Sequence, residues 1–406
     1  MTAELLDVDS ALRQMLDAAR PLGPARTLPL EQACGRVLAA ALRSPIDVPG
    51  CDNSQMDGYA LRCVDVAVPG ARLPVTQRIA AGHPGAALAG GEAARIFTGA
   101  PIPHGADAVV PQEQCEADGD TVRVLAQPRA GDWIRRRGSD VTAGQIVLDA
   151  GQRLRAQDVA QAAAVGVAEL AVAPAPRVAL LTTGDELLSP GEPLRPGAIY
   201  DSNRYLLAAM LRAYGCAVSD LGRVPDRLDA TVDALRSAAE AHDVIVSCGG
   251  VSVGGEDHVK PALHRIGALA MWQIAMKPGK PLAFGSVLRA DGSPAHFVGL
   301  PGNPVSSFVT CAVFVRPFLL ALQGARALHP GALQLPSASD WPRADRRREF
   351  LRARLDANGA VELYPNQNSA VLSSVVWGDG LIDNPPGRAF ARGDLVRFIP
   401  FEALLR

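Results

Sequence analysis

The sequence predicts a multidomain α/β protein built around a doubly wound, mostly parallel sheet. Its 406 residues exceed what one hydrophobic core usually serves, since single cores rarely grow past roughly 250 residues. Between residues 178 and 322, continuous apolar runs alternate with helical periodicity, which is typical of parallel strands covered by helices on both faces. The flanking regions instead show short apolar runs separated by Gly and Pro, which favour separate β domains.

Composition and charge exclude several classes of function. The chain is 48% hydrophobic and carries 40 basic against 42 acidic residues, so its charge does not favour wrapping a nucleic acid or lying on an anionic membrane. Residues 1–10 lack a cationic start and a continuous apolar stretch. No run approaches the roughly 20 apolar residues that cross a bilayer. We therefore expect a cytoplasmic protein that binds neither nucleic acid nor membrane.

The seven cysteines form no C-x-x-C pair and lie far apart in the sequence. This distribution favours reduced, buried thiols over a disulfide framework or a zinc site.

The N-terminal third changes its hydrophobic period twice. Residues 10–43 have helical spacing, the period falls to about two from residue 46, and helical spacing returns at 156–165. Asp118-Gly119 lies between two short apolar runs, which predicts a hairpin. Prolines in 172–177 then indicate a stiff linker.

Four domains follow from these changes. They are a helical domain split between 1–45 and 144–175, a β insertion domain at 46–143, an α/β domain at 176–326 and a C-terminal β domain at 327–406.

The α/β domain alternates strands and helices. A helix from Ser202 should be capped by Asp201 or Ser202 and should stop at Gly215. The expected strands are 178–181, 217–221, 243–247, 272–276, 282–288 and 296–300, and the other expected helices are 228–235, 259–266 and 305–322. In the C-terminal domain Asn358-Gly359 predicts a second hairpin, in a small β-barrel or sandwich.

Four unusual loops follow predicted strands of the α/β domain, at 182–186, 248–257, 277–281 and 299–304. Ligands of such folds bind at the carboxyl ends of the strands. We therefore expect these loops to converge at one edge of the sheet.

The second of these loops contains a G-x-S-x-G pattern at Gly250–Gly254. Ser252 could be the nucleophile of a hydrolase, but a nucleophile elbow needs a helix immediately after the serine, with an acid and a His further on. The alternative is an anion cradle, in which glycine N–H groups and the Ser252 hydroxyl contact the ligand. The spacing favours the cradle.

Charged residues surround this proposed anion site. Lys277 and Lys280 flank a Pro-Gly turn, and two such ammonium groups suit a phosphate or another tetrahedral oxyanion. The acidic pairs 185–186 and 256–257 either hold Mg²⁺ together with substrate oxygens or cap helices. The sequence alone leaves both interpretations open.

Taken together, the loops resemble the molybdopterin molybdenumtransferase family, which includes the bacterial MoeA proteins and the related domain of gephyrin. The matching segments occur in family order over nearly the whole chain. They are DNSQMDGYA (52–60), TGAPIP (98–103), RRRG (135–138), TGDEL (183–187), GGVSVG (249–254) with Asp257, KPGKP (277–281) and GLPGNP (299–304).

The resemblance implies an elongated homodimer of four-part chains with a MogA-like α/β domain, in which the cleft joins this domain to the β insertion of the partner chain. The implied reaction inserts molybdate into the dithiolene of adenylylated molybdopterin, with Mg²⁺-assisted cleavage of the phosphoanhydride and release of AMP. Transient contacts with other proteins of molybdenum cofactor biosynthesis are also implied. The alternative is a catalytically silent, molybdopterin-binding scaffold.

The resemblance also assigns site residues by motif position. The implied catalytic residues are Asp57, Thr98, Asp140, Glu186, Asp226 and Asp257, of which Asp57, Glu186, Asp226 and Asp257 are also the implied Mg²⁺ ligands. The implied substrate-binding residues are Gly249, Gly250, Ser252, Lys277, Lys280, Pro281, Pro301, Pro304, Arg348, Arg352 and Ser369. One position departs from the pattern, since Gln273 stands where some members carry a third Lys.

Overall fold

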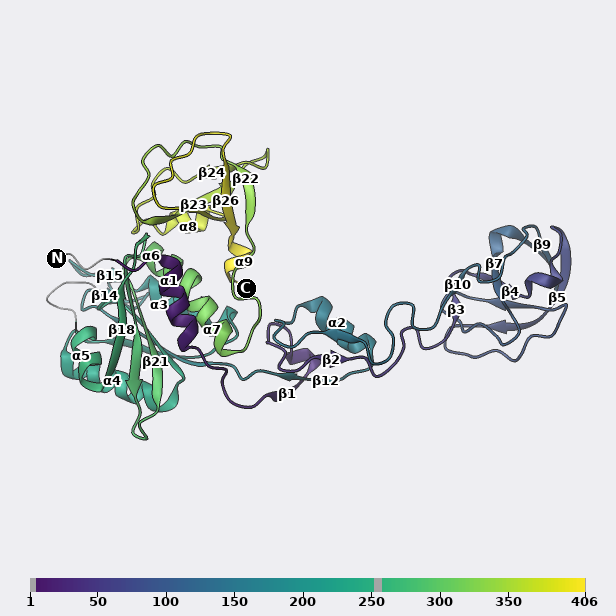
Figure 1. The fold of residues 1–406 in the computed structure, drawn as a ribbon, viewed down its shortest axis with the longest axis horizontal. Coiled ribbons are helices and arrows are strands. Elements are labelled where there is room, and N and C mark those ends of the chain that lie inside the picture. Colours follow the sequence, from purple (N-terminus) through teal and green to yellow (C-terminus); the bar gives the residue numbers. More distant parts are fainter. Residues whose placement is uncertain (1–4, 252–257, 406) are drawn as a thin grey trace. The chain divides into compact units, whose positions relative to one another are not determined.

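The computed structural model describes residues 5–251 and 258–405 (Figure 1). These residues form two compact units. Of the described residues, unit 1 contains 5–40, 150–155, 171–251 and 258–405, and unit 2 contains 41–149 and 156–170.

Unit 1 contains a six-stranded sheet in the order β16-β13-β17-β21-β20-β18. The first four strands are parallel, and β20 and β18 are antiparallel to their neighbours. The prediction of a mostly parallel sheet is therefore confirmed. The strands are β13 (Arg177–Thr183), β16 (Ala217–Val224), β17 (Val244–Cys248), β18 (Gly267–Gln273), β20 (Pro281–Leu288) and β21 (Pro294–Leu300).

Helices cover both faces of this sheet. Alternate residues of a strand point to opposite faces, so the side chains of one strand pack against two different sets of helices. Val178 and Leu180 of β13 pack in one apolar cluster with helices α1, α3 and α7, whereas Ala179 and Leu181 pack in another with α4 and α5. Figure 1 shows α4 and α5 on one side of β18 and β21 and α1 and α7 on the other. The helices are α1 (Val8–Ala18), α3 (Ser202–Ala213), α4 (Leu228–Ala241), α5 (Val259–Ile266), α6 (Pro304–Thr310) and α7 (Arg316–Leu322).

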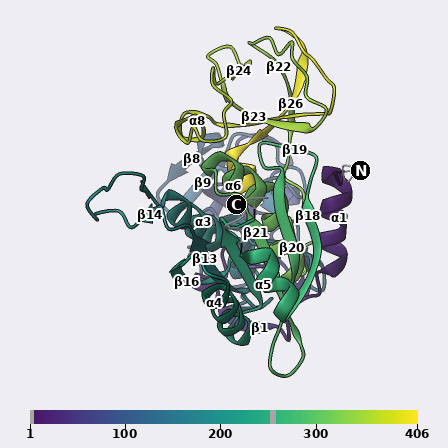
Figure 2. The same cartoon turned by 90° about the vertical axis from the view of Figure 1, so that its left-hand side faces the viewer.

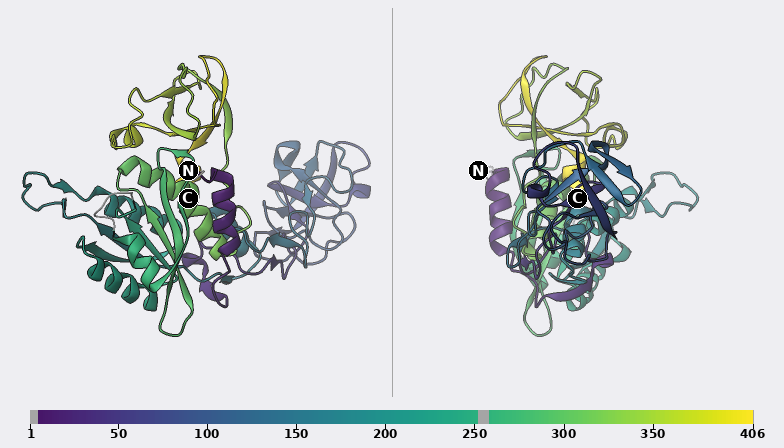
Figure 3. Two further views of the ribbon diagram at one scale, coloured as in Figure 1. Left: turned by 60° about the vertical axis from the view of Figure 1, so that its left-hand side comes forward. Right: turned by 90° about the vertical axis from the view of Figure 1, so that its right-hand side faces the viewer.

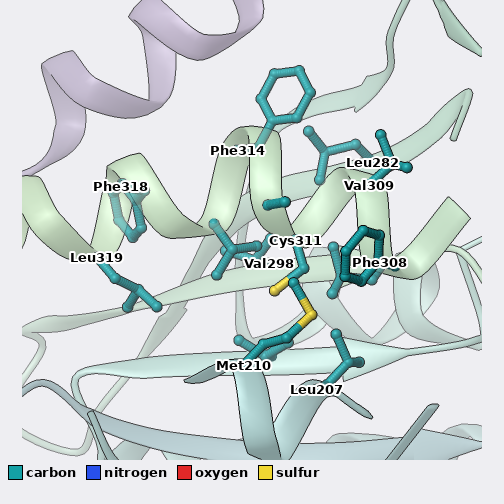
Figure 4. Close-up of a cluster of buried hydrophobic side chains, with 14 of the residues drawn as sticks. Leu207, Met210, Leu282, Val298, Phe308, Val309, Cys311, Phe314, Phe318 and Leu319 are labelled. Carbon is teal, nitrogen blue, oxygen red and sulfur yellow. The ribbon is translucent and has the colours of Figure 1, made fainter. Parts of the chain in front are cut away.

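A π-helical segment, η4 (Cys311–Val315), joins α6 to α7, so that one helical run extends from Pro304 to Leu322. By length and composition this run could cross a membrane, so the expectation that no run approaches that length is wrong. However, 89% of its most apolar window is buried inside the protein. It is the central helix of the core. Figure 4 shows its side chains Phe308, Val309, Cys311, Phe314, Phe318 and Leu319 with Leu207, Met210, Leu282 and Val298.

The C-terminal β domain also belongs to unit 1 (Figure 3, yellow). Its sheet has the order β19-β23-β25-β26-β22, and β24 pairs with β23. The hairpin predicted at Asn358-Gly359 is confirmed, since it joins β23 to β24 and Gly359 has φ of +77°. The elements are β19 (Met276–Lys277), β22 (Leu333–Pro336), β23 (Arg348–Leu355), β24 (Val361–Leu363), β25 (Gly380–Asn384), β26 (Leu395–Pro400), α8 (Ser373–Trp377) and α9 (Phe401–Leu405).

The helical prediction for residues 30–43 is wrong. After α1 the chain forms β1 (Arg26–Pro29), the 3-10 turn η1 (Leu30–Gln32) and β2 (Leu42–Arg43). Val37 and Leu38 are buried next to each other and form isolated bridges to Arg153 and Val172. Consecutive buried residues around a turn produced the apparent helical spacing. In addition, α1 packs into the core of the α/β sheet.

Unit 2 contains the β insertion, whose main sheet has the order β7-β4-β6-β5-β9-β8. The predicted hairpin is confirmed, because Asp118 pairs with Thr121 and Gly119 has φ of +58°. The other elements of unit 2 are β3 (Asn53–Ser54), β4 (Gly58–Leu61), η2 (Cys63–Asp65), β5 (Ala71–Ile79), β6 (Ala93–Ile96), β7 (Ala108–Pro111), η3 (Gln112–Gln114), β8 (Cys115–Asp118), β9 (Thr121–Val124), β10 (Ile134–Arg135), β11 (Ile146–Leu148) and α2 (Ala156–Ala164).

Three short strands complete the description. In the sequence, β12 (Glu169–Val172) crosses the boundary between the two units, which falls after Leu170. The strands β14 (Leu187–Leu188) and β15 (Ile199–Tyr200) belong to unit 1.

Candidate functional site

A pocket of about 1010 Å³ lies at the carboxyl ends of the parallel strands of unit 1. Residues of all four predicted loops line it, so their predicted convergence at one edge of the sheet is confirmed. The start of β20 lies at the same edge, because β20 runs antiparallel to β21. The lining includes Thr183, Gly184, Glu186, Asp226, Gly249, Gly250, Lys277, Lys280, Pro281, Pro301, Pro304, Arg347 and Ser369.

Two glycines after β17 bring the backbone close to β13. Gly249 has φ of +90°, and a Cβ there would lie 2.5 Å from the carbonyl oxygen of Thr183. Gly250 has φ of +65° and lies against Val259 and the Thr183 hydroxyl. That hydroxyl is buried and has no hydrogen-bond partner among the residues that the structure describes. The N–H of Gly249 donates to the carbonyl oxygen of Leu300 at 3.1 Å. The two glycines therefore form a cradle in which the Thr183 hydroxyl is the unused polar group shown in the described residues.

The rest of the predicted cradle lies outside the described residues, including Ser252 and Asp257. The helix that follows, α5, begins at Val259. Cys248, directly before the glycines, is fully buried, and this burial raises the pKa of its thiol to about 11. At neutral pH the thiol is therefore protonated and a poor nucleophile.

Two carboxylates line the pocket beside β13. The Asp226 carboxylate accepts a hydrogen bond from the backbone N–H of Asp185 at 3.0 Å, which ties together two loops that are 41 residues apart. Glu186 folds back over Gly184, where an added Cβ would lie 2.7 Å from its carboxylate. Glu186 and Asp226 are thus brought to one pocket, as predicted by the resemblance.

These two carboxylates are candidate ligands for the Mg²⁺ that the resemblance implies. Within 5–251 and 258–405, no group of three or more His, Cys, Asp or Glu side chains is placed to hold a metal ion. Mg²⁺ is usually held by one or two carboxylates together with substrate oxygens and water. Glu186 and Asp226 fit that role, because both offer carboxylate oxygens and both line a pocket large enough to hold substrate oxygens as well.

Sequence reasoning missed two polar residues of α3 as pocket residues. Asp201 caps the helix by accepting from the N–H of Arg204 at 3.1 Å, as expected, and it also accepts from the Thr182 hydroxyl at 2.7 Å. Asn203 donates to the carbonyl oxygen of Gly302 at 2.6 Å, while its own Oδ1 is buried without a partner in the described part of the chain. The capping signal identified Asp201, but no local signal marked Asn203.

The lysine loop contributes two different lysines. Lys277 is partly buried, with its Nζ 3.2 Å from Glu349 and 3.4 Å from Asp345. Lys280 is exposed and makes no ion pair within the described ranges. Between them, Gly279 has φ of +111°, and a Cβ there would meet the Thr310 hydroxyl at 2.5 Å. A tight glycine turn therefore presents both ammonium groups to one pocket.

The C-terminal domain completes the pocket wall. Ser369 lies in the lining, and its carbonyl oxygen accepts from the N–H of Val305 at 3.0 Å. Arg347 also lines the pocket and forms a bidentate pair with Asp345 at 2.9 and 3.1 Å. Hydrogen bonding with Arg347 holds the pKa of Asp345 far below its ordinary value.

Arg348 and Arg352 lie outside this lining. Arg348 pairs with Asp383 and with Asp9, and it lines a second cavity of about 500 Å³. Arg352 is fully buried, donates to Ser374 and has its pKa lowered by burial to about 10. The sequence missed Arg347 because residues 346–348 are all Arg and nothing local distinguishes them. In the structure Arg347 lies in the bend that precedes β23, and Arg348 is the first residue of that strand.

Unit 2 holds the other implied catalytic residues. The N–H and the hydroxyl of Thr98 both donate to one oxygen of Asp57, each at 2.8 Å. These bonds, the backbone bond first, lower the pKa of Asp57. Asp140 is exposed, and its backbone N–H donates to Val48 at 3.0 Å. Asp57 and Thr98 therefore form a pair, and Asp140 has separate contacts.

The fold and the pocket define a multidomain α/β protein with a glycine cradle, two lysines and two carboxylates at its strand ends. Comparison with known protein families finds three matches that follow one another along the chain. Residues 6–166 match the MoeA N-terminal region (domain I and II), 179–321 a probable molybdopterin binding domain, and 334–401 the MoeA C-terminal region (domain IV).

Individual relatives agree with these matches. The molybdopterin molybdenumtransferase of Haemophilus influenzae is 36% identical, over 99% of this chain and 100% of its own. Molybdopterin molybdenumtransferase 2 of Mycobacterium tuberculosis is 40% identical, over 92% of this chain and 93% of its own. The crystal structure of a molybdopterin biosynthesis MoeA protein from Pyrococcus horikoshii superposes with a TM-score of 0.83 at 27% identity, covering 98% of this chain and 100% of that one. The chain belongs to the molybdopterin molybdenumtransferase family and is an enzyme of molybdenum cofactor biosynthesis.

Proposed function

We propose that this chain inserts molybdate into the dithiolene of adenylylated molybdopterin and releases AMP as the phosphoanhydride is cleaved. The pocket carries this proposal, because one cavity of about 1010 Å³ combines the glycine cradle, both lysines and two carboxylates. Ligand pockets of roughly 300–1,000 Å³ hold drug-sized molecules, so this volume suits a large nucleotide-linked substrate.

Different residues of the pocket bind the phosphates and the metal ion in this proposal. The backbone N–H of Gly250 approaches phosphate oxygens, since that of Gly249 already donates to the carbonyl oxygen of Leu300 at 3.1 Å. Lys277 and Lys280 neutralise the charge of the phosphates. Glu186 and Asp226 would hold Mg²⁺, which when bound supplies further charge neutralisation on the phosphoanhydride. Cleavage of this kind depends mainly on positioning and electrostatics, so no covalent nucleophile is needed.

We further propose a cytoplasmic homodimer that makes transient contacts with other proteins of molybdenum cofactor biosynthesis. The family resemblance supports this assembly, and light scattering of the purified protein tests it. A monomer under all tested concentrations would contradict the proposed dimer.

The decisive assay mixes the protein with adenylylated molybdopterin, molybdate and Mg²⁺. We expect AMP release and formation of active molybdenum cofactor. Binding of molybdopterin without AMP release would support the silent scaffold instead. Esterase activity that is lost in Ser252→Ala would support the hydrolase reading.

Asp57→Ala tests the assignment of Asp57, whose carboxylate is held by two hydrogen bonds from Thr98. We expect AMP release to fall by about 10²-fold or more, the range typical of lost acid-base or electrostatic groups, while the melting temperature stays near that of the wild type. Glu116→Ala is the matched control, because Glu116 forms only a surface ion pair with Arg123 in the same unit. Unchanged AMP release by Asp57→Ala would remove Asp57 from the site.

A further inference from the structure

The strand that carries Lys277 belongs to two domains at once. In sequence β19 lies within the α/β domain, but it pairs in parallel with β23 of the C-terminal domain, with Lys277 opposite Glu349. The N–H of Arg348 donates to the carbonyl oxygen of Ala275 at 3.1 Å and extends this contact. Figure 2 shows β19 beside β23. The backbone of Lys277 is therefore placed by the C-terminal sheet.

The side chain of Glu349 is completely buried. One carboxylate oxygen, Oε2, accepts from the indole N–H of Trp341 at 2.8 Å and from the amide of Asn384 at 3.3 Å. The other, Oε1, lies 3.2 Å from the ammonium of Lys277. A buried carboxylate is costly unless it is paired and hydrogen-bonded. Trp341 and Asn384 thus fix the carboxylate in the orientation that pairs it with Lys277.

Asp345 provides a second carboxylate at 3.4 Å from the Lys277 ammonium. Its charge is already shared with Arg347, which pairs with it through two nitrogens. Glu349 forms its ion pair with Lys277 at 3.2 Å, and, after the hydrogen bonding with Asp345, its charge also helps to raise the pKa of Arg347.

Lys277 nevertheless remains accessible to a ligand. Its side chain is 39% exposed and lines the main pocket. An ammonium group has three N–H donors, and contacts with Glu349 at 3.2 Å and Asp345 at 3.4 Å leave one for an anion in the pocket. A lysine side chain is otherwise flexible, so an ion pair at its tip restricts where its charge can lie.

We propose that Glu349 is a positioning residue that holds the Lys277 ammonium at the pocket wall, where an incoming tetrahedral oxyanion meets a fixed positive charge. The inference rests on the proposed function, because molybdate is the oxyanion concerned. It gives the C-terminal β domain a defined part in the reaction, as the support of a substrate-binding lysine of the α/β domain.

The first test needs no turnover. The chain has three lysines, at 260, 277 and 280, so acetylation of the full-length protein by an amine-selective reagent can be followed at each site by mass spectrometry. In the wild type, ion pairing should slow the labelling of Lys277 relative to exposed Lys280. In Glu349→Gln we expect the ratio of Lys277 to Lys280 labelling to rise by about five-fold, as the ion pair is lost. An unchanged ratio would overturn the proposal.

Three further variants separate positioning from general destabilisation. Glu362→Gln removes the charge of a surface ion pair with Arg354 in the same sheet and should leave the labelling ratio unchanged. Trp341→Phe keeps the Glu349 charge but removes the donor that orients it, so it should raise the ratio by a smaller factor, and it also serves if Glu349→Gln does not fold. Glu349→Asp keeps the charge and should restore part of the wild-type ratio. A ratio that rises equally in Glu362→Gln would show loosening of the domain and contradict the proposal.

The kinetic test uses AMP release. Glu349→Gln should raise KM for molybdate by about ten-fold, as expected when a charged contact to a ligand is weakened, while KM for adenylylated molybdopterin changes less. Glu349→Asp should recover part of this loss. Altered labelling with an unchanged KM for molybdate would contradict the oxyanion role of Glu349. A wild-type protein that shows the predicted labelling but no AMP release would instead contradict the proposed function, so the two failures are distinguishable.

Discussion

Gly249 is a single residue at which backbone conformation and close packing coincide. Its φ of +90° is strained for any other residue, and an added Cβ would lie 2.5 Å from a backbone oxygen that cannot move freely. We expect Gly249→Ala to lower the free energy of unfolding by about 2–4 kcal/mol through strain and overpacking, measured by urea denaturation. Gly359→Ala is the control, since Gly359 has φ of +77° but no atom within 4 Å of an added Cβ. Equal losses in the two variants would show that conformation alone matters at Gly249.

The pair formed by Asp57 and Thr98 predicts a pH effect with a defined sign. The two hydrogen bonds from Thr98 lower the pKa of Asp57 below its ordinary value of 3.8. The bonds therefore stabilise unit 2 above pH 3.8, and this contribution disappears as the pH falls through the lowered pKa.

Thr98→Val tests this effect, because it removes the hydroxyl donor and keeps the backbone donor. We expect the pKa of Asp57 to rise part of the way toward 3.8, measured by NMR titration of its carboxyl carbon. Thr121→Val is the control, since that hydroxyl donates only to the carbonyl of Asp118 on the hairpin. No rise in Thr98→Val would mean that the backbone bond accounts for the whole shift.

At the scale of elements, the cap of α3 connects helix and sheet. Asp201 is only 5% exposed and accepts both from Arg204 N–H and from the Thr182 hydroxyl of β13. Asp201→Ala should lower the free energy of unfolding by about 2–4 kcal/mol, because it removes a cap and leaves a buried hydroxyl unpaired. Asp7→Ala, at the exposed cap of α1, should cost less. Urea denaturation compares the two, and an equal loss would contradict a role of Asp201 beyond capping.

The elements of the α/β domain could be predicted because period, caps and turns agree there. Asp201 and Gly215 mark the two ends of α3, and the apolar run predicted at 243–247 is shifted by one residue from β17. The strand predicted at 272–276 is wrong, since β18 covers Gly267–Gln273 and β19 covers Met276–Lys277. Residues 30–43 could not be predicted, since buried neighbours such as Val37 and Leu38 imitate helical spacing while their partners lie far away in the sequence. The spacing of apolar residues predicts the type of element only where a single element packs one face against one core.

At the scale of the molecule, the two units have separate hydrophobic cores. Each of the five buried clusters of the described residues draws its members from one unit, such as Phe318 from unit 1 and Val110 from unit 2. Domains with their own cores commonly unfold as separate cooperative units. We therefore expect more than one transition in calorimetry of the intact chain.

Core truncations should identify the transitions. Phe318→Ala, in the cluster of Figure 4, should lower the stability of unit 1 by about 3–5 kcal/mol, and Val110→Ala should lower that of unit 2 by about 2–4 kcal/mol. Each should shift one calorimetric transition and leave the other in place. Val376→Ala is the control, since Val376 is 82% exposed. A single transition that both core variants shift equally would show that the units unfold together.

The sequence by itself determined the family, the mostly parallel sheet and the four loops that meet at its edge. It could do so because strand periodicity, caps and glycine-rich turns are local signals, and parallel strands bring their carboxyl ends to the same side. Only the tertiary structure decided that Arg347 rather than Arg348 lines the pocket and that Glu349 forms an ion pair with Lys277. Those contacts depend on strand register and on pairing between β19 and β23, which join residues 72 positions apart. A local pattern does not record which residues such a pairing brings together, because the two strands are far apart in the sequence and a shift of one residue in register would turn Glu349 to the other face of the sheet.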